Sequence, residues 1–164
     1  AFTLGREWEI SAKEAQAMID KWFDSFPEVR DWKLRAEGSA QHASVARTLL
    51  GRSRPIRALQ LRHDRSYAYG LRAASNTPVQ GSAADIVIAA MLGLRESELL
   101  TRLGYRQILQ VHDEIILQGP EKHADEALAE VVRIMEDPLP FRLRAPLKVD
   151  ARHSQSWGEE VDDF

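Results

Sequence analysis

The chain has 164 residues, of which 44% are hydrophobic and 29% charged, and its formal net charge at pH 7 is −3. This length suits one domain, or one domain with a small appendage. Cysteine is absent, which excludes disulfides, thiolate zinc sites and cysteine nucleophiles. No apolar run approaches the roughly 20 residues that span a bilayer, and no signal-peptide pattern opens the chain, so we expect no membrane partner. The first residue is Ala rather than Met, so we expect a fragment or a processed product.

Residues 11–26 have the clearest helical pattern in the chain. Ser11 and Glu14 have the spacing of a capping box, and apolar residues follow at helical intervals. A proline ends this helix, and a second helix is expected over 27–37, stopping near Gly38. We expect the aromatic side chains of both helices to serve packing, with a cofactor-binding surface as the weaker alternative.

The middle of the chain combines one short extended segment with two helical ones. Residues 44–50 are predicted as a strand that reaches a turn at "GRSRP". Residues 66–75 are a candidate helix, after which Pro78 is expected to interrupt the chain. From Gln80 to about Leu100 the apolar residues recur on one helical face, and a glycine closes that helix.

Positive charge is concentrated between Arg47 and Arg72. This basic segment contains seven arginines and a single acidic residue, Asp64, whereas the rest of the chain is acidic overall. The arginines are Arg47, Arg52, Arg54, Arg57, Arg62, Arg65 and Arg72. Such asymmetry indicates a surface that faces a polyanion. A solvated, flexible arm is the alternative.

The C-terminal part of the chain has the pattern of a small sheet with one helix. Residues 108–111 and 114–117 are two β-forming runs separated by His112 and Asp113, which predicts a tight hairpin. A further amphipathic helix is expected over 121–136, and the alternation of "LKVDA", 147–151, predicts a final strand. Together with the preceding helices, this order predicts an α+β fold with a small antiparallel sheet.

Three titratable residues lie at the predicted hairpin tip: His112, Asp113 and Glu114. Adjacent carboxylates between apolar runs repel each other where water is scarce, unless a cation balances their charge. Mg²⁺ suits this position, because it binds hard carboxylate oxygens and often takes one or two of them together with substrate phosphates. The tip is therefore a candidate metal site, and the alternative is an exposed turn whose acids meet water.

Asn76 and Gln80 form a second candidate site. They lie four residues apart, so a helix that includes both would place them on one face. Their amides can donate to the minor-groove acceptors that every base pair presents, which tests base-pair shape without reading sequence. The alternative is that Asn76 caps a helix ahead of Pro78 and that Gln80 is merely exposed.

Five segments of the chain resemble, in the same order, conserved segments of the family A DNA polymerases, the group that contains bacterial DNA polymerase I. These segments are "AFTLGREWEISAKEAQAMIDKWFDSFPEV", "TLLGRSR" (48–54), "RAASNTPVQGSAAD" (72–85), "LQVHDEIILQGP" and "LKVDARHSQSWGE". The fourth resembles the third conserved motif of the family. The wording "LLTRLGYRQILQVHDEIILQGPE" is similar to plant- and protist-type organellar members in particular.

The resemblance implies a DNA-directed DNA polymerase of DNA replication or repair, which performs template-directed nucleotidyl transfer with two Mg²⁺ ions. It implies that residues 1–43 are a helical fingers segment, and that 44–164 are a palm segment with the Arg-rich connection, a long helix and the catalytic hairpin. The first catalytic Asp of the family and its O helix have no counterpart here. We therefore expect the C-terminal part of a polymerase, whose partner is the remainder of the polymerase chain.

By the same resemblance, the hairpin residues act in catalysis. Asp113 is a metal ligand for ions that activate the primer 3′-hydroxyl and stabilise the triphosphate. Glu114 assists through metal-bound water or hydrogen bonding, and His112 contacts the primer terminus.

The helix residues are expected to bind DNA. The resemblance implies that Asn76 and Gln80 contact the primer–template duplex, and that Arg72, one turn earlier, reaches phosphate or the minor groove. Deoxynucleoside triphosphates are the second expected ligand. Asp85 is expected to be a buried, hydrogen-bonded helix acid rather than a metal ligand.

Two other functions remain open on the sequence. A non-catalytic, duplex-DNA-binding remnant of a polymerase is favoured by the missing first Asp and disfavoured by the intact His112-Asp113-Glu114 triplet. A metal-dependent phosphohydrolase would need further ligands. On the polymerase interpretation, the 164 residues alone are expected to be inactive.

Overall fold

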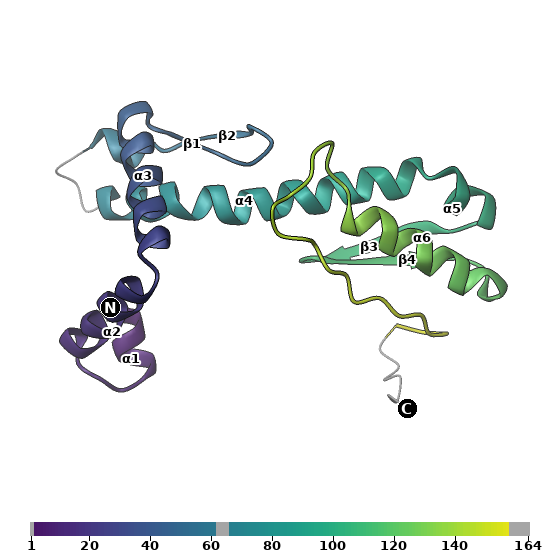
Figure 1. Cartoon of the computed structure of the whole chain (residues 1–164), viewed down its shortest axis with the longest axis horizontal. Helices are drawn as coiled ribbons and strands as arrows, with labels where there is room; N and C mark the ends of the chain where they lie inside the picture. The colour runs from purple at the N-terminus through teal and green to yellow at the C-terminus, as the bar shows by residue number, and fades with distance from the viewer. Residues whose placement is uncertain (1, 62–65, 158–164) are drawn as a thin grey trace. The chain divides into compact units, whose positions relative to one another are not determined.

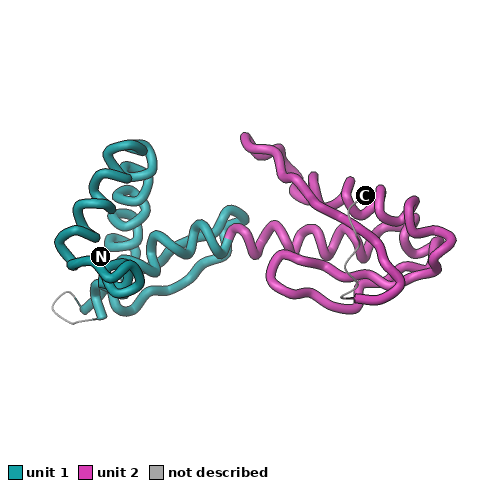
Figure 2. The backbone as a smooth tube through the Cα atoms, turned by 90° about the horizontal axis from the view of Figure 1, so that it is seen from below, with its two compact units in different colours: residues 1–81 teal, residues 82–164 magenta. Residues whose placement is uncertain are grey.

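The computed structural model describes residues 2–61 and 66–157, and its chain forms two compact units (Figures 1 and 2). The first unit extends to Gly81 and the second begins at Ser82, within one long helix. Helices and two small antiparallel sheets make up both units, which confirms the predicted α+β class.

The first unit begins with three helices, α1 (Phe2–Glu7), α2 (Ala12–Ser25) and α3 (Pro27–Ala43). The predicted capping box is confirmed: the Glu14 N–H donates to Ser11 Oγ at 3.2 Å, and the Ser11 N–H donates to Glu14 Oε2 at 2.9 Å. The side-chain hydrogen bond from Ser11 lowers the pKa of Glu14. These bonds satisfy N–H groups that the start of a helix leaves without backbone partners.

Helix α3 passes through Gly38, so the predicted end near this residue is wrong. An interior glycine costs a helix only about 1 kcal/mol. Beyond it, Ala40 is buried in the core of the first unit, and this packing extends the helix to Ala43. The helix ends where Ser44 adopts a left-handed conformation, with φ 53°.

A small hairpin follows, in which β1 (Val45–Arg47) pairs with β2 (Ser53–Pro55). The predicted strand over 44–50 is confirmed only in its first half, because the chain turns back at Thr48. The Thr48 N–H donates to the Arg52 carbonyl at 3.0 Å, and Gly51 supplies the positive φ (83°) that this turn requires. Three of the five residues of the expected "GRSRP" turn therefore form the second strand.

Helix α4 (Ser66–Glu96) follows a short 3₁₀ helix, η1 (Arg57–Gln60). The first part of α4 packs in the core of the first unit. That core comprises Ala40, Ala46, Ile56, Leu59, Ala73 and Ala74. The helix continues through Pro78, so the predicted interruption there is wrong.

The second unit contains the rest of α4, then α5 (Glu98–Leu103), β3 (Arg106–Val111), β4 (Glu114–Gln118), η2 (Glu121–His123) and α6 (Ala124–Glu136). The break before α5 was not predicted; Ser97 caps α5 by accepting from the Leu100 N–H at 3.2 Å. Gly104, with φ 82°, closes α5 as expected. The predicted hairpin and the helix within 121–136 are confirmed.

The final strand predicted over 147–151 is wrong, because these residues belong to no sheet. A strand is defined by backbone hydrogen bonds with a neighbouring strand, whereas the contacts of this segment are with a side chain. The Val149 N–H donates to Glu136 Oε1 at 3.4 Å, and Lys148 forms an ion pair with the same carboxylate.

Candidate metal-binding hairpin and nucleic-acid interface

The β3–β4 hairpin (Figure 1) carries the three candidate site residues of the second unit at its tip: His112, Asp113 and Glu114. Val111 and Glu114 are the last paired residues, so His112 and Asp113 form a two-residue turn. The Gln110 side-chain amide donates to the His112 carbonyl and ties the turn to β3. The structure therefore brings His112, Asp113 and Glu114 together at one loop.

The backbone of this turn is strained at His112, which has φ 55°. In a two-residue hairpin loop, a positive φ at the first position is the pattern of a type II′ turn, which usually takes glycine there. A non-glycine residue in the left-handed region costs roughly 1–3 kcal/mol and is concentrated at functional sites. Glu9 and Ser44 also have positive φ values, 55° and 53°, so the feature that distinguishes His112 is its place at an exposed hairpin tip beside two acidic residues.

All three side chains at the tip are exposed to solvent. This exposure agrees with the exposed turn that the sequence left open as an alternative. Exposure leaves Asp113 and Glu114 accessible to a ligand. In this chain, solvation by water is sufficient to screen the repulsion between the two carboxylates.

The donor set at the tip fits part of a magnesium site. Among residues 2–61 and 66–157, no group of three or more His, Asp or Glu side chains is arranged to hold a metal ion. Mg²⁺ often binds to only one or two protein carboxylates, because it keeps water and phosphate oxygens as its other ligands. Asp113 and Glu114 can supply those carboxylates, provided that other groups complete the coordination.

The hairpin packs against the core of the second unit. Ile115 and Leu117, two residues apart on β4, pack against a buried cluster on α4, α5 and α6. This cluster comprises Leu94, Leu100, Leu103, Ala127, Val131 and Ile134. At the open end of the hairpin, the Tyr105 hydroxyl donates to the Pro120 carbonyl at 3.0 Å. The tip thus extends from a rigid base.

The other candidates, Arg72, Asn76 and Gln80, lie on α4 in the first unit, and all three are exposed. Their four-residue spacing on one continuous helix places them on one face, as the sequence predicts for Asn76 and Gln80. The alternative of Asn76 as a helix cap is wrong, since this residue lies ten positions inside α4. We call this exposed row the α4 polar row.

The arginines of the basic segment differ in their surroundings. Arg47, Arg52, Arg54, Arg57 and Arg72 are exposed, whereas Arg62 and Arg65 lie outside the described residues. Arg52 donates to the Gly81 carbonyl at 3.1 Å, and Arg54 to Thr77 Oγ1 at 3.1 Å. The charge pattern did not predict that two of these guanidinium groups bind α4.

Asp85 is buried, with 4% of its surface exposed, which agrees with the expectation of a buried helix acid. By length and composition, α4 is the one described helix that could cross a membrane. One such helix is weak evidence, because core helices of soluble proteins meet the same criteria. Asp85 and the α4 polar row would be costly in a bilayer. The absence of a membrane partner stays a prediction.

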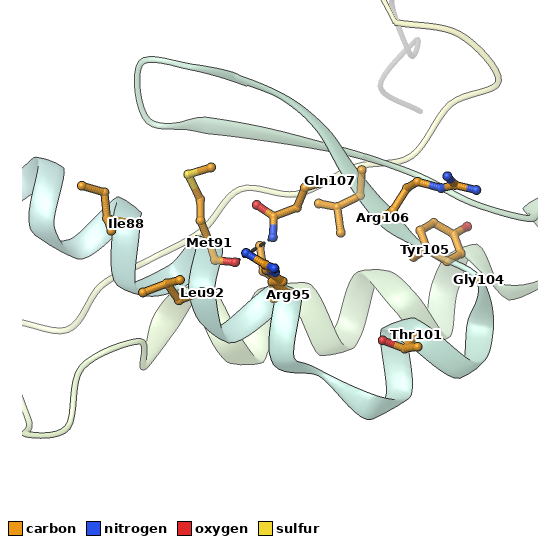
Figure 3. Close-up of a pocket in the computed structure, with 11 residues that line it drawn as sticks. Ile88, Met91, Leu92, Arg95, Thr101, Gly104, Tyr105, Arg106 and Gln107 are labelled. Carbon is orange, nitrogen blue, oxygen red and sulfur yellow. Dashed lines mark hydrogen bonds between the residues drawn. The ribbon is translucent and has the colours of Figure 1, made fainter.

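A pocket of about 740 Å³ lies in the second unit among α4, α5 and the start of β3 (Figure 3). Its walls are mostly apolar, with Arg95 and Arg106 as charged members. The Gln107 side chain donates to the Met91 carbonyl at 2.7 Å and closes one wall. No predicted site residue lines this pocket, and it contains no carboxylate or imidazole for catalysis.

Comparisons with known proteins match this chain to one family. Residues 1–159 match the family model described as DNA polymerase family A. The chain is 43% identical over 159 residues to Arabidopsis thaliana DNA polymerase I A, chloroplastic/mitochondrial, covering 96% of this chain and 15% of that protein. It is 41% identical over 165 residues to the thermostable DNA polymerase I of Thermus filiformis, covering 99% and 19%. Because organellar and bacterial relatives match to similar degrees, the particular similarity to organellar members stays a prediction.

A solved structure gives the same result. The POL domain of Pol1 from M. smegmatis, in complex with a DNA primer-template and dNTP, aligns with a TM-score of 0.81 and 33% identity, over 88% of this chain and 25% of that one. The chain therefore spans a minor part of the relatives that it matches. On the match of the family model to residues 1–159, this chain belongs to the family A DNA polymerases.

Proposed function

We propose that the chain forms part of the active site of a DNA-directed DNA polymerase, which adds nucleotides to a primer under the direction of a template. The observation that carries the proposal is the strained, exposed His112-Asp113-Glu114 tip, in a chain that matches the family over residues 1–159. The solved relative holds primer-template DNA and dNTP. These are the ligands that we propose for the complete enzyme, in DNA replication or repair.

The division of the chain follows from this proposal. Residues 1–43 would be a fingers segment and 44–164 a palm segment. The remainder of the polymerase would supply the first catalytic Asp and the O helix. The hairpin offers two carboxylates and no third ligand among the described residues, which is consistent with a site that another segment completes.

In the mechanism that we propose, the Asp113 carboxylate would hold Mg²⁺, and Glu114 would assist it through hydrogen bonding. Bound Mg²⁺ would supply activation of the primer 3′-hydroxyl and neutralisation of the triphosphate charge. His112, exposed beside Asp113, contacts the primer terminus. The rigid base under Ile115 and Leu117 keeps these groups in place during transfer.

The α4 polar row would bind the duplex. Asn76 and Gln80 present amide N–H groups that can donate to purine N3 and pyrimidine O2 in the minor groove. Because correct pairs of any sequence present these acceptors in similar positions, the contacts test pairing geometry. Arg72, one turn earlier on the same face, can reach a phosphate or the groove.

Gln80→Ala in the complete polymerase is expected to slow primer extension and to weaken discrimination against mispaired ends. Loss of one hydrogen bond to the duplex costs roughly 1–3 kcal/mol. The measurement is the extension rate from matched and from mismatched termini. Val79→Ala, which alters the exposed neighbouring residue, is the control. Unchanged rates on both termini in the Gln80 variant would leave Gln80 as a surface residue.

The 164-residue chain alone is expected not to extend a primer, although it is expected to bind duplex DNA weakly. Two metal ions about 3.5–4 Å apart need carboxylates on both sides, and the described residues supply one pair at one tip. Primer extension with the purified chain, Mg²⁺ and all four nucleotides checks this expectation. Robust extension would contradict the proposal that another segment completes the site.

Duplex binding by the chain is expected to depend steeply on salt. Two to four phosphate contacts would lower the affinity by about 10- to 100-fold between 50 and 200 mM salt, because each contact releases counterions. A salt titration of fluorescence anisotropy measures the slope. Lys148→Met, which removes an exposed charge outside the basic segment, is expected to keep it. A slope near zero would favour the alternative of a solvated arm.

A non-catalytic, duplex-binding remnant is the second candidate, and the incomplete donor set at the hairpin favours it. The two candidates differ in one measurement, the dependence of primer extension by the complete polymerase on Asp113. A phosphohydrolase would need further carboxylates or histidines near the tip, and the described residues provide none in such a group.

A further inference from the structure

Helix α4 continues through Pro78. Proline has no N–H to donate to the carbonyl four residues earlier, here Ala74, and its ring crowds that carbonyl. A helix interior with proline usually kinks or ends. Contacts from outside the helix must therefore stabilise α4 at this point.

Two arginines of the β1–β2 hairpin bind α4 on either side of Pro78. Arg54 Nη1 donates to Thr77 Oγ1 at 3.1 Å, and the Thr77 hydroxyl donates in turn to the Ala73 carbonyl at 2.7 Å. Arg52 Nη2 donates to the Gly81 carbonyl at 3.1 Å. Thr77 is only 6% exposed, so its hydroxyl is out of reach of a DNA phosphate.

The turn of the hairpin also lies directly against the helix at Gly81. A Cβ atom at Gly81 would lie 2.6 Å from Thr48 Cγ2, which is closer than real side chains approach. The Thr48 hydroxyl accepts from the Arg52 N–H at 3.1 Å, so the packed residue and the arginine are linked. The contact is therefore an extended surface rather than one flexible side chain.

These contacts fix the rotation of α4 about its own axis. Successive helical residues are rotated by about 100°, so Thr77 and Gly81 share a face adjacent to that of Asn76 and Gln80. A helix held at the first pair presents the second pair in a fixed direction. If the Pro78 turn loosened, the α4 polar row would lose its alignment.

We propose that Arg52 and Arg54 are positioning residues for duplex recognition. They hold the Pro78 turn of α4 helical and so align Asn76 and Gln80 with the minor groove. The inference rests on the proposed function for its effect on DNA, and it gives Arg52 and Arg54 a role other than the polyanion contact that the basic segment as a whole indicates. Thr77 is the receiving group on α4.

The test compares Arg54→Met, Thr77→Val and the double variant in the complete polymerase. Each single variant is expected to lower the ratio of matched to mismatched extension by about tenfold, and the double variant no further, because both remove one interaction. Thr77→Ser keeps the hydroxyl and is expected to retain the wild-type ratio. Arg57→Met removes an exposed charge of the same segment and is expected to change salt dependence but not this ratio.

A second measurement does not depend on polymerase activity. Amide hydrogen exchange at residues 79–81 is expected to be about tenfold faster in Arg54→Met and in Thr77→Val, because the helical turn after Pro78 opens more often. Unchanged exchange in both variants would overturn the proposal. So would a wild-type ratio in Thr77→Val combined with a lower salt slope in Arg54→Met, the result expected of a phosphate ligand. A wild-type enzyme that does not extend primers would contradict the proposed function, whereas the exchange result would still test the positioning role.

Discussion

Asp113→Ala in the complete polymerase is expected to lower nucleotide incorporation by about a thousandfold or more, with primer–template affinity nearly unchanged. The carboxylate lies at an exposed tip and would hold a cation whose charge acts mainly on the transition state. Its loss should therefore appear in the chemical step rather than in DNA binding. Single-turnover incorporation at saturating Mg²⁺ measures that step.

The control for this experiment is Asp31→Ala, which removes an exposed carboxylate from α3, away from the hairpin in sequence. It is expected to behave as the wild type. A rate within about tenfold of wild type for Asp113→Ala would remove this residue from the proposed metal site. That outcome would mean that the hairpin takes no direct part in the chemical step.

Leu100→Ala is expected to destabilise the chain by about 2–5 kcal/mol. Leu100 is 1% exposed and belongs to the buried cluster against which Ile115 and Leu117 pack. Truncation leaves a cavity that the surrounding helices fill only in part. Urea unfolding of wild type and variant gives the change from the shift of the midpoint at constant slope.

Leu92→Ala is the matched control, because Leu92 is 51% exposed on the neighbouring helix α4. Its expected change is within about 0.5 kcal/mol. Equal losses for the two leucines would mean that the second unit does not pack around Leu100. The β3–β4 hairpin would then lack the packed support that is described above.

The parts of the fold that could be predicted are those set by nearby residues. The capping box needs only Ser11 and Glu14, and the β3–β4 hairpin needs two β-forming runs with two residues between them. Helix α4 continues past Pro78, where local rules predict an end, and near this residue it accepts hydrogen bonds from residues 23 and 29 positions away, which local rules do not consider. The last predicted strand failed for a related reason, because alternation does not supply a pairing partner.

The candidate site shows the same limit. The identity of the tip residues followed from the sequence, but their exposure did not, because it depends on how far the turn extends beyond the strands. Arg52 and Arg54 have the composition of a phosphate-binding segment, yet they donate to a helix. A guanidinium group serves either acceptor with the same N–H groups, so charge patterning alone does not distinguish them.

The positive φ at His112 has a consequence for directed evolution of this segment. Glycine adopts that backbone conformation without the steric cost that His112 bears. A library selected only for heat tolerance would therefore enrich glycine at this position and lose the imidazole. If His112 contacts the primer as proposed, selection for thermal tolerance would favour glycine at this position and selection for primer extension would favour histidine. A screen that combines both would then keep histidine and find stabilising changes at other positions.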